Sequence, residues 1–254
     1  MRRFLTLLGL WFGLIVVFIV LYTVGGQRAS ALTELMPYLV VPIFLVVFAY
    51  NLVRARKTNA LSMASVARLN EGRYVEALAG FEQVARRAPK SPVALHNLGV
   101  AQLGLWQVAE AEQSFARAVK RSRFYFDLRN IAQPNHALCA ALLGKVPEAN
   151  ASLLACEKLK VADSPQAILC RAVLAARAGK LEDARDQLAR PELRMLAGSS
   201  RGLAEVLSAW LASQLAGEAR RVDVVSMLGE AGVDRIKPVW PELHDFVVRA
   251  SAAA

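Results

Sequence analysis

A short repeated pattern constrains the fold of this chain more than any other feature of its sequence. Three segments start with glycine and a basic residue, continue with a large apolar residue, and place alanine five positions after the glycine. They begin at Gly72, Gly144 and Gly179, and a fourth segment, Trp106 to Ala111, follows the pattern without the glycine. The four alanines (Ala77, Ala111, Ala149 and Ala184) are 34, 38 and 35 residues apart. A period of this length indicates a stack of similar structural units.

Each part of the pattern has a role in a pair of helices. The glycine ends one helix in a left-handed turn, the apolar residue anchors the next helix, and the alanine lets two helices cross closely. A large residue follows four positions after each alanine, at Phe81, Phe115, Leu153 and Leu188. Ser91-Pro92 and Ser164-Pro165 match an N-cap followed by proline in the first helical position. Apolar residues at three-and-four spacing across residues 61–254 therefore predict an all-α domain.

These units resemble the tetratricopeptide-repeat family, whose unit is a helix–turn–helix of about 34 residues. The family pattern has a Leu-Gly pair, an alanine followed four positions later by phenylalanine, and a late proline. Leu98-Gly99, Ala77 with Phe81, Ala111 with Phe115, and Pro89 match it. The resemblance implies an α-solenoid with four units over residues 58–198. We expect a degenerate fifth unit and a C-terminal capping helix over residues 199–254, because terminal repeats are usually atypical.

The first 57 residues predict a two-span transmembrane hairpin. Residues 4–24 carry no charge and residues 35–53 form a second apolar run. Each is long enough to cross a hydrocarbon core of about 30 Å at about 1.5 Å per residue. A cleaved signal peptide is the alternative, since Arg2 and Arg3 are followed by an apolar run and by Ala29-Ser30-Ala31. The length of the first run and the presence of a second one favour the hairpin.

Basic residues predict the orientation of this hairpin. Arg2 and Arg3 precede the first span and Arg54, Arg56 and Lys57 follow the second, whereas the link at residues 25–34 carries only Arg28. Lys and Arg concentrate on the cytoplasmic side of membrane proteins. We therefore expect an integral membrane protein with both termini and the repeat domain in the cytoplasm.

The sequence lacks the motifs of common catalytic and metal centres. His96, His136 and His244 are far apart, and no zinc-protease, nucleophile-elbow or phosphate-loop motif occurs. Cys139, Cys156 and Cys170 form no C-x-x-C pair and are expected to be reduced core residues. We therefore expect no enzyme, no cofactor and no metal. Nucleic acid is disfavoured as a partner despite a pI near 9.9, because residues 1–60 hold six Lys/Arg and one acid and so contribute half of the net charge of +10.

The family resemblance implies a concave surface, lined by the first helix of each unit, that holds a segment of another protein. The positions that it assigns to this surface are Val66, Leu69, Val93, His96, Asn97, Val100, Leu103, Leu138, Leu142, Leu169, Val173 and Arg177. Most are apolar, which favours an apolar or amphipathic helix as the ligand. Of the Lys/Asn/Arg clamp that some family members use for acidic tails, only Asn97 is present. The alternative is that these residues pack on the cap or on a second copy of the chain.

The longest interval between units contains a basic-aromatic segment. It comprises Lys120, Arg121, Arg123, Phe124, Tyr125 and Phe126. One interpretation is a contact for a phosphate, an anionic lipid or an acidic partner. The other is a long turn whose aromatic side chains fill the gap that it creates, and this second interpretation is the one we favour from the sequence.

Together these features predict a membrane-anchored adaptor or scaffold that binds a partner protein on a cytoplasmic helical solenoid. The alternative is an accessory or assembly subunit of a membrane transport or envelope machine. In that case the hairpin itself would pack on other spans, and Gly9 and Gly13 form a weak small-x3-small motif for such packing.

Overall fold

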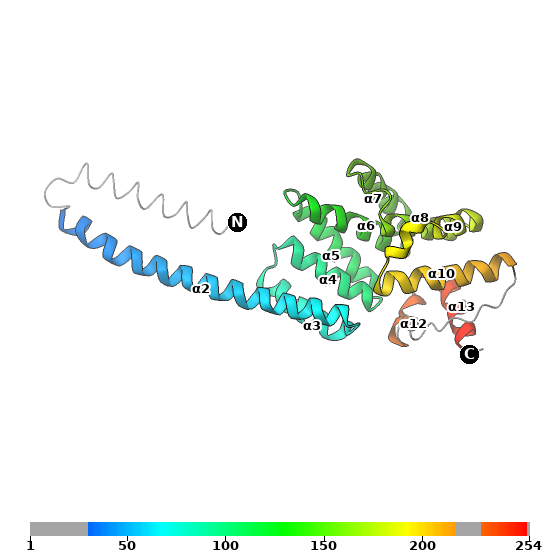
Figure 1. Ribbon diagram of the computed structural model, residues 1–254, viewed down its shortest axis with the longest axis horizontal. Coiled ribbons are helices and arrows are strands. Elements are labelled where there is room, and N and C mark those ends of the chain that lie inside the picture. Colours follow the sequence, from blue (N-terminus) through cyan, green and yellow to red (C-terminus); the bar gives the residue numbers. More distant parts are fainter. Residues whose placement is uncertain (1–29, 217–229, 253–254) are drawn as a thin grey trace. The chain divides into compact units, whose positions relative to one another are not determined.

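The computed structural model describes residues 30–216 and 230–252, which are helical with connecting turns and contain no strand (Figure 1). The prediction of an all-α fold is confirmed for these residues. The first predicted span at residues 4–24 lies outside them, as do Gly217 and Val222 of the degenerate fifth unit.

The chain forms two compact units, Met1–Lys57 and Thr58–Ala254. The boundary falls inside helix α2, Ser30–Asn70. In the first unit α2 begins within the predicted link and includes the second predicted span. Within the described part of the chain, no helix combines the length and apolarity needed to cross a membrane.

The second unit is a series of helices joined by short turns. After residues 58–70 of α2 come α3 (Tyr74–Arg87), α4 (Pro92–Gly104), α5 (Val108–Arg121), α6 (Phe126–Leu142), α7 (Val146–Lys158), α8 (Pro165–Arg177), α9 (Leu181–Leu188), the 3-10 helix η2 (Pro191–Met195), α10 (Gly198–Ala216), α12 (Glu230–Ile236) and α13 (Pro241–Ala252). Helices α4, α6 and α8 each pack on the helix that follows, and α6 also packs on α8. Figure 1 shows α4 to α9 as successive helix pairs.

Left-handed residues form the turns within these pairs. Gly72, Gly144 and Gly179 have φ angles of 76°, 71° and 75°, which confirms the predicted role of the repeated glycine. Trp106 takes the matching place in the second pair with φ 57°. A non-glycine residue in this conformation costs roughly 1–2 kcal/mol. Burial of the indole in the core offsets that cost, because the Trp106 side chain is almost fully buried.

Small residues allow the helices of a pair to cross closely. The four repeated alanines are fully buried, as are Phe81 and Phe115, whereas Leu153 and Leu188 are partly buried against the core. A Cβ on Gly99 would lie 2.9 Å from the Phe115 ring, so the Leu-Gly pair is also a point of close contact. The helices can approach this closely because alanine and glycine have small side chains, or none, at the points of contact.

The two Ser-Pro pairs start helices in different ways. Ser91 Oγ accepts a hydrogen bond of 3.3 Å from the Ala94 amide, and Pro92 is the first residue of α4, as predicted. Helix α8 begins at Pro165, but the Ser164 hydroxyl makes no capping hydrogen bond and is buried without a partner among the described residues. Ser164 is therefore the N-cap residue and Pro165 the first helical residue, as predicted, but the Ser164 side chain does not cap the helix.

The close crossing at Ala149 gives a direct test of the helix packing. Replacing Ala149 by leucine should lower the free energy of unfolding by about 1–3 kcal/mol, because it overpacks a fully buried crossing. Ala151→Leu, two residues along α7 at an exposed position, is the matched control and should change stability little. Chemical denaturation followed by circular dichroism measures both. Equal stabilities of the two variants would contradict the helix register.

Candidate partner-binding surface

Helices α4, α6 and α8 provide most of the predicted inner surface, but five of its twelve predicted contact residues are core residues in this structure. Leu103, Leu138, Leu142, Leu169 and Val173 are at most 6% exposed and belong to one hydrophobic cluster. Val66 and Leu69 pack against a second cluster around Phe81. The five core residues are therefore not open to a partner in this conformation, which corrects the expectation from the sequence.

The C-terminal part of the chain supplies the side chains that complete this core. Helix α10 contacts α4 and α8 as well as α9. It therefore packs on several helices of the stack and not only on the helix that precedes it. The shared cluster includes Leu207 and Trp210 of α10 and Phe246 of α13. The chain's own C-terminal helices therefore contribute to the core in which these apolar residues are buried, and α10 does so by direct contact with α4 and α8.

Polar contacts also hold the C-terminal segment on the stack. Arg177, a predicted groove residue at the end of α8, donates hydrogen bonds of 3.2 and 2.8 Å to the carbonyl of Val239. Its guanidinium lies 4.9 Å from the centre of the Trp240 ring, and burial lowers the pKa of Arg177. Trp240 in turn meets Trp210 edge to face at 5.6 Å. Arg235 of α12 donates a hydrogen bond to the carbonyl of Leu105.

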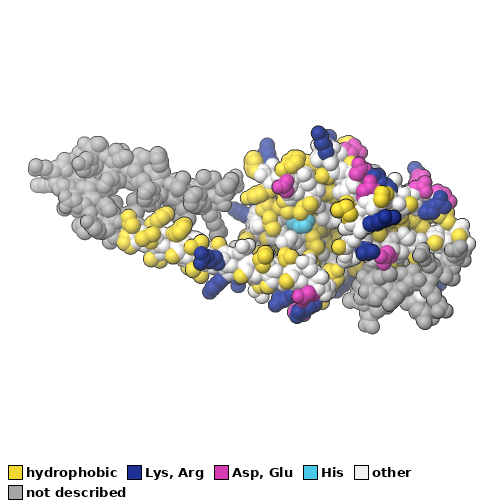
Figure 2. Space-filling model, in the orientation of Figure 1, with side chains coloured by type: hydrophobic (Ala, Val, Ile, Leu, Met, Phe, Trp, Pro, Cys, Tyr) yellow, Lys and Arg dark blue, Asp and Glu magenta, His cyan; other side chains and the backbone are white. Residues whose placement is uncertain are grey.

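The part of the inner surface that remains open lies near the first turns of α4 and α6. Val93 is 47% exposed and Ile131 is 52% exposed. Asn97 and Val100 are partly exposed beside them along α4. On the face shown in Figure 2, hydrophobic side chains are exposed over the helix stack. An apolar segment of a partner could contact this open part without displacing the C-terminal helices.

His96 lies on α4 between Val93 and Asn97, but its ring faces the core. Its ring is buried, lies 5.5 Å from the Phe115 ring, and has Nδ1 3.4 Å from Asn97 Oδ1. Nε2 has no hydrogen-bond partner among the described residues. Burial lowers the pKa of His96, so the ring is neutral at physiological pH. If Nδ1 donates to Asn97, Nε2 is an unused acceptor.

The basic-aromatic segment, residues 120–126, lies at the turn from α5 to α6 and its aromatic side chains are exposed. Phe124, Tyr125 and Phe126 are 86%, 50% and 64% exposed. The interpretation that they fill a gap between units is therefore wrong. The small side chain of Ser122 is buried there instead. Arg123 lies over the Phe124 ring at 5.9 Å.

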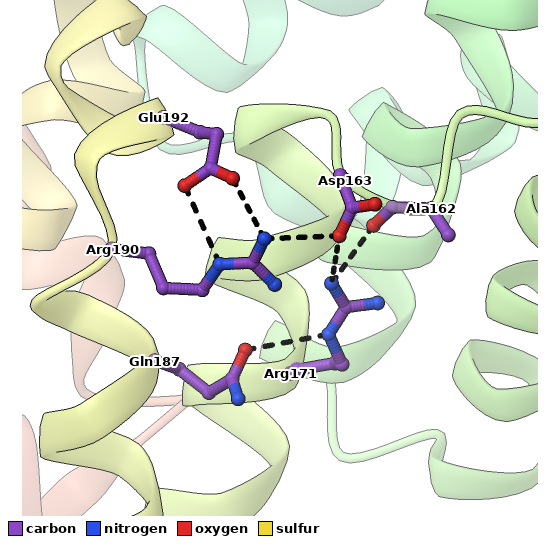
Figure 3. Close-up of polar contacts among 6 residues, drawn as sticks. All are labelled: Ala162, Asp163, Arg171, Gln187, Arg190 and Glu192. Carbon is purple, nitrogen blue, oxygen red and sulfur yellow. Dashed lines mark hydrogen bonds and ion pairs between the residues drawn. The ribbon is translucent and has the colours of Figure 1, made fainter.

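A polar cluster that the sequence did not reveal fastens the turn between α7 and α8 (Figure 3). Arg190 lies 3.1 Å from Asp163 and 2.7 Å from Glu192, and these contacts raise the pKa of Arg190. Arg171 donates a 2.8 Å hydrogen bond to the Ala162 carbonyl. All four charged side chains have partners within the cluster, so the cluster joins α8, η2 and the turn.

A second cluster connects three helices through His136. Its Nδ1 lies 2.8 Å from Ser152 Oγ and its Nε2 lies 3.2 Å from Glu112 Oε1, while Glu112 Oε2 pairs with Lys145 at 3.2 Å. The residue types are those of a nucleophile, base and acid. However, Ser152 is buried in the middle of α7, where backbone amides are used by the helix and cannot stabilise an oxyanion. The cluster therefore ties α5, α6 and α7 together.

The three cysteines are free and buried, as expected. Burial raises the pKa of Cys156 to about 11 and that of Cys170 to about 12, and it also raises the pKa of Cys139. They are protonated at neutral pH. Among the described residues, no three His, Cys, Asp or Glu side chains are grouped as a metal site requires.

No protein-family model matches this sequence, and no curated protein matches it. A functional proposal therefore depends on the surfaces described above.

The attachment of the C-terminal segment can be measured by a double-mutant cycle between Arg177→Met and Trp240→Leu. Methionine keeps most of the apolar length of Arg177. The loss of the hydrogen bonds to Val239 and the loss of indole volume at Trp240 each occur in both backgrounds and cancel. We expect a coupling free energy of about 0.5–2 kcal/mol from the cation–π contact. Denaturation of the four proteins provides it. A coupling of zero would show that the two side chains are not in contact.

Proposed function

We propose that this protein is a membrane-anchored scaffold that binds a segment of a partner protein on a tetratricopeptide-like helix stack. The observation that carries the proposal is the exposure of apolar side chains along residues 41–53 of α2. Val41, Ile43, Phe44, Leu45, Val46, Val47, Phe48, Tyr50, Leu52 and Val53 are exposed. Burial of a large apolar side chain is worth about 1.5–3 kcal/mol, so such a segment favours an apolar environment.

The pattern along this segment supports lipid as that environment. From Val41 to Ala49 every residue is apolar, so all sides of the helix are apolar rather than one face. The polar exception is Asn51, whose amide donates a 2.8 Å hydrogen bond to the Val47 carbonyl. Polar side chains in membrane helices are commonly satisfied by the backbone in this way.

The charges after the segment support a cytoplasmic helix stack. Arg54, Arg56 and Lys57 follow the apolar residues directly. Basic residues at this position favour retention of the C-terminal side in the cytoplasm. The proposed anchor is a hairpin in which residues 4–24 form the other span.

The open part of the inner surface, formed by Val93, Asn97, Val100 and Ile131, is the proposed binding site. Its apolar side chains suit an apolar or amphipathic helix. The buried part of the inner surface is already packed in the free protein, so the site does not depend on the partner for its folding.

The second candidate function is an accessory subunit that packs on other membrane proteins through its anchor. The exposure of apolar side chains on all sides of residues 41–53 favours it, because another span could cover them as lipid does. The two candidates differ in which residues contact the partner.

Site-specific photo-crosslinking in the full chain distinguishes them. A crosslinking amino acid at position 93 or 131 should capture the same partner, whereas position 75, an exposed valine on α3, should not. Val93→Asp together with Ile131→Asp should weaken capture at least about tenfold, because each loses roughly 1 kcal/mol of apolar burial and buries a charge. Val75→Asp is the matched control.

Equal capture from positions 75 and 93 would contradict the proposed site. Capture from position 46 in the apolar segment, without capture from 93 or 131, would support the accessory-subunit function instead.

A further inference from the structure

The exposed aromatic side chains of the basic-aromatic segment are displayed by an ordered turn. Ser122 is fully buried, and its hydroxyl donates a 3.0 Å hydrogen bond to the Val119 carbonyl. The Tyr125 amide donates a 2.8 Å hydrogen bond to the Ser122 carbonyl. These bonds fix the backbone while three neighbouring aromatic side chains stay in solvent. Contiguous exposed apolar side chains of this kind usually mark a contact surface.

The topology places this turn on the edge where the chain enters the helix stack. Gly80 of α3 packs against Ser65 of α2. Ser65 precedes the turn at Gly72 and Gly80 follows it by a similar number of residues, so the two helices are antiparallel. Thr58 and Arg87 are also separated from Gly72 by similar numbers of residues, so they lie at the same end of this helix pair. The turns from α3 to α4 and from α5 to α6 lie on that side of the alternating helices. We call this side, residues 58, 86–91 and 120–126, the entry edge.

The entry edge carries positive charge that is mostly unpaired among the described residues. Its basic residues are Arg86, Arg87, Lys90, Lys120, Arg121 and Arg123. Within the described part of the chain, only Arg86 among them forms an ion pair, at 3.7 Å from Glu82. On the opposite edge Arg73 pairs with Glu76, Lys145 with Glu112 and Arg185 with Glu182. The opposite edge therefore has less unpaired positive charge, and Lys180 is its basic residue without an ion pair among the described residues.

We propose that the entry edge binds the surface of a bilayer that contains anionic lipids. Phe124, Tyr125 and Phe126 enter the interfacial layer, while Lys120, Arg121 and Arg123 contact lipid phosphates. Aromatic side chains favour this layer, and basic residues are attracted to the anionic leaflet surface. The inference rests on the proposed anchor, because the anchor brings the edge to the bilayer.

Chain connectivity favours lipid over an acidic protein as the occupant. The apolar segment at residues 41–53 and the basic residues Arg54, Arg56 and Lys57 lead directly into Thr58 on the same edge. Anchoring therefore gives the edge a high effective concentration at the bilayer surface. A second attachment would orient the helix stack and leave the open part of the inner surface in a defined position.

The test uses the full chain reconstituted into vesicles. Phe124→Cys is labelled with a polarity-sensitive fluorophore, and the buried native thiols make the labelling selective, with the unmodified chain as background. Val146→Cys, an exposed position on the opposite edge, is the matched control. Vesicles of neutral phosphatidylcholine alone are compared with vesicles that also contain phosphatidylglycerol. We expect emission from position 124, but not from 146, to shift to shorter wavelength in the anionic vesicles.

Charge removal tests the role of the basic residues. Each Lys or Arg near an anionic surface changes the contact equilibrium about fivefold. Arg121→Gln with Arg123→Gln should therefore reduce the inserted fraction strongly, whereas Lys180→Gln on the opposite edge should not. Raised ionic strength should act in the same direction as the double replacement.

Flotation of the same samples separates the inference from the anchor. Chains that float with the vesicles but show no shift at position 124 would overturn the inference and leave the anchor in place. Chains that do not float would overturn both. An equal shift in neutral and anionic vesicles would overturn the role of lipid charge, and a shift caused by soluble polyglutamate in neutral vesicles would assign the edge to an acidic protein.

Discussion

The hydrophobic core that α4, α6 and α8 share with the C-terminal helices α10 and α13 is the interaction on which the rest of the second unit depends. The repeated alanines set the helix spacing and the left-handed turns set the direction of each return. This arrangement brings Leu138, Leu169 and other large apolar side chains to one side of the stack. Left in water they would cost about 1.5–3 kcal/mol each. Side chains of α10 and α13 belong to the same cluster, which therefore links residues far apart in the sequence.

Local interactions are the ones that the sequence predicts well. The turn at Gly144 and the crossing at Ala149 follow from a few neighbouring residues, so their roles can be inferred from the pattern. The bonds from Arg177 to Val239 join residues 62 positions apart, and no periodicity encodes them. His136 is similar, because its partners Ser152 and Glu112 come from two other helices.

The basic-aromatic segment shows a different reason for failure. Its extra length suggested a gap to be filled by aromatic side chains, but buried Ser122 closes the turn with one small residue. The aromatics are then free to face solvent. The open inner surface at Val93 and Ile131 lies near the same ends of α4 and α6 as this segment. In the proposed account, contact with lipid at the entry edge therefore positions the partner-binding surface relative to the bilayer.

Hydrogen exchange of the full chain, with and without Trp240→Ala, tests most directly whether the C-terminal helices are part of the core. The account predicts that amides of α10, α13 and α8 lose protection together by a similar factor, because these helices share one hydrophobic cluster with Trp240. Amides of α3, which packs in a separate cluster around Phe81, should keep more of their protection. Loss of protection confined to α13, with α8 unchanged, would contradict the account.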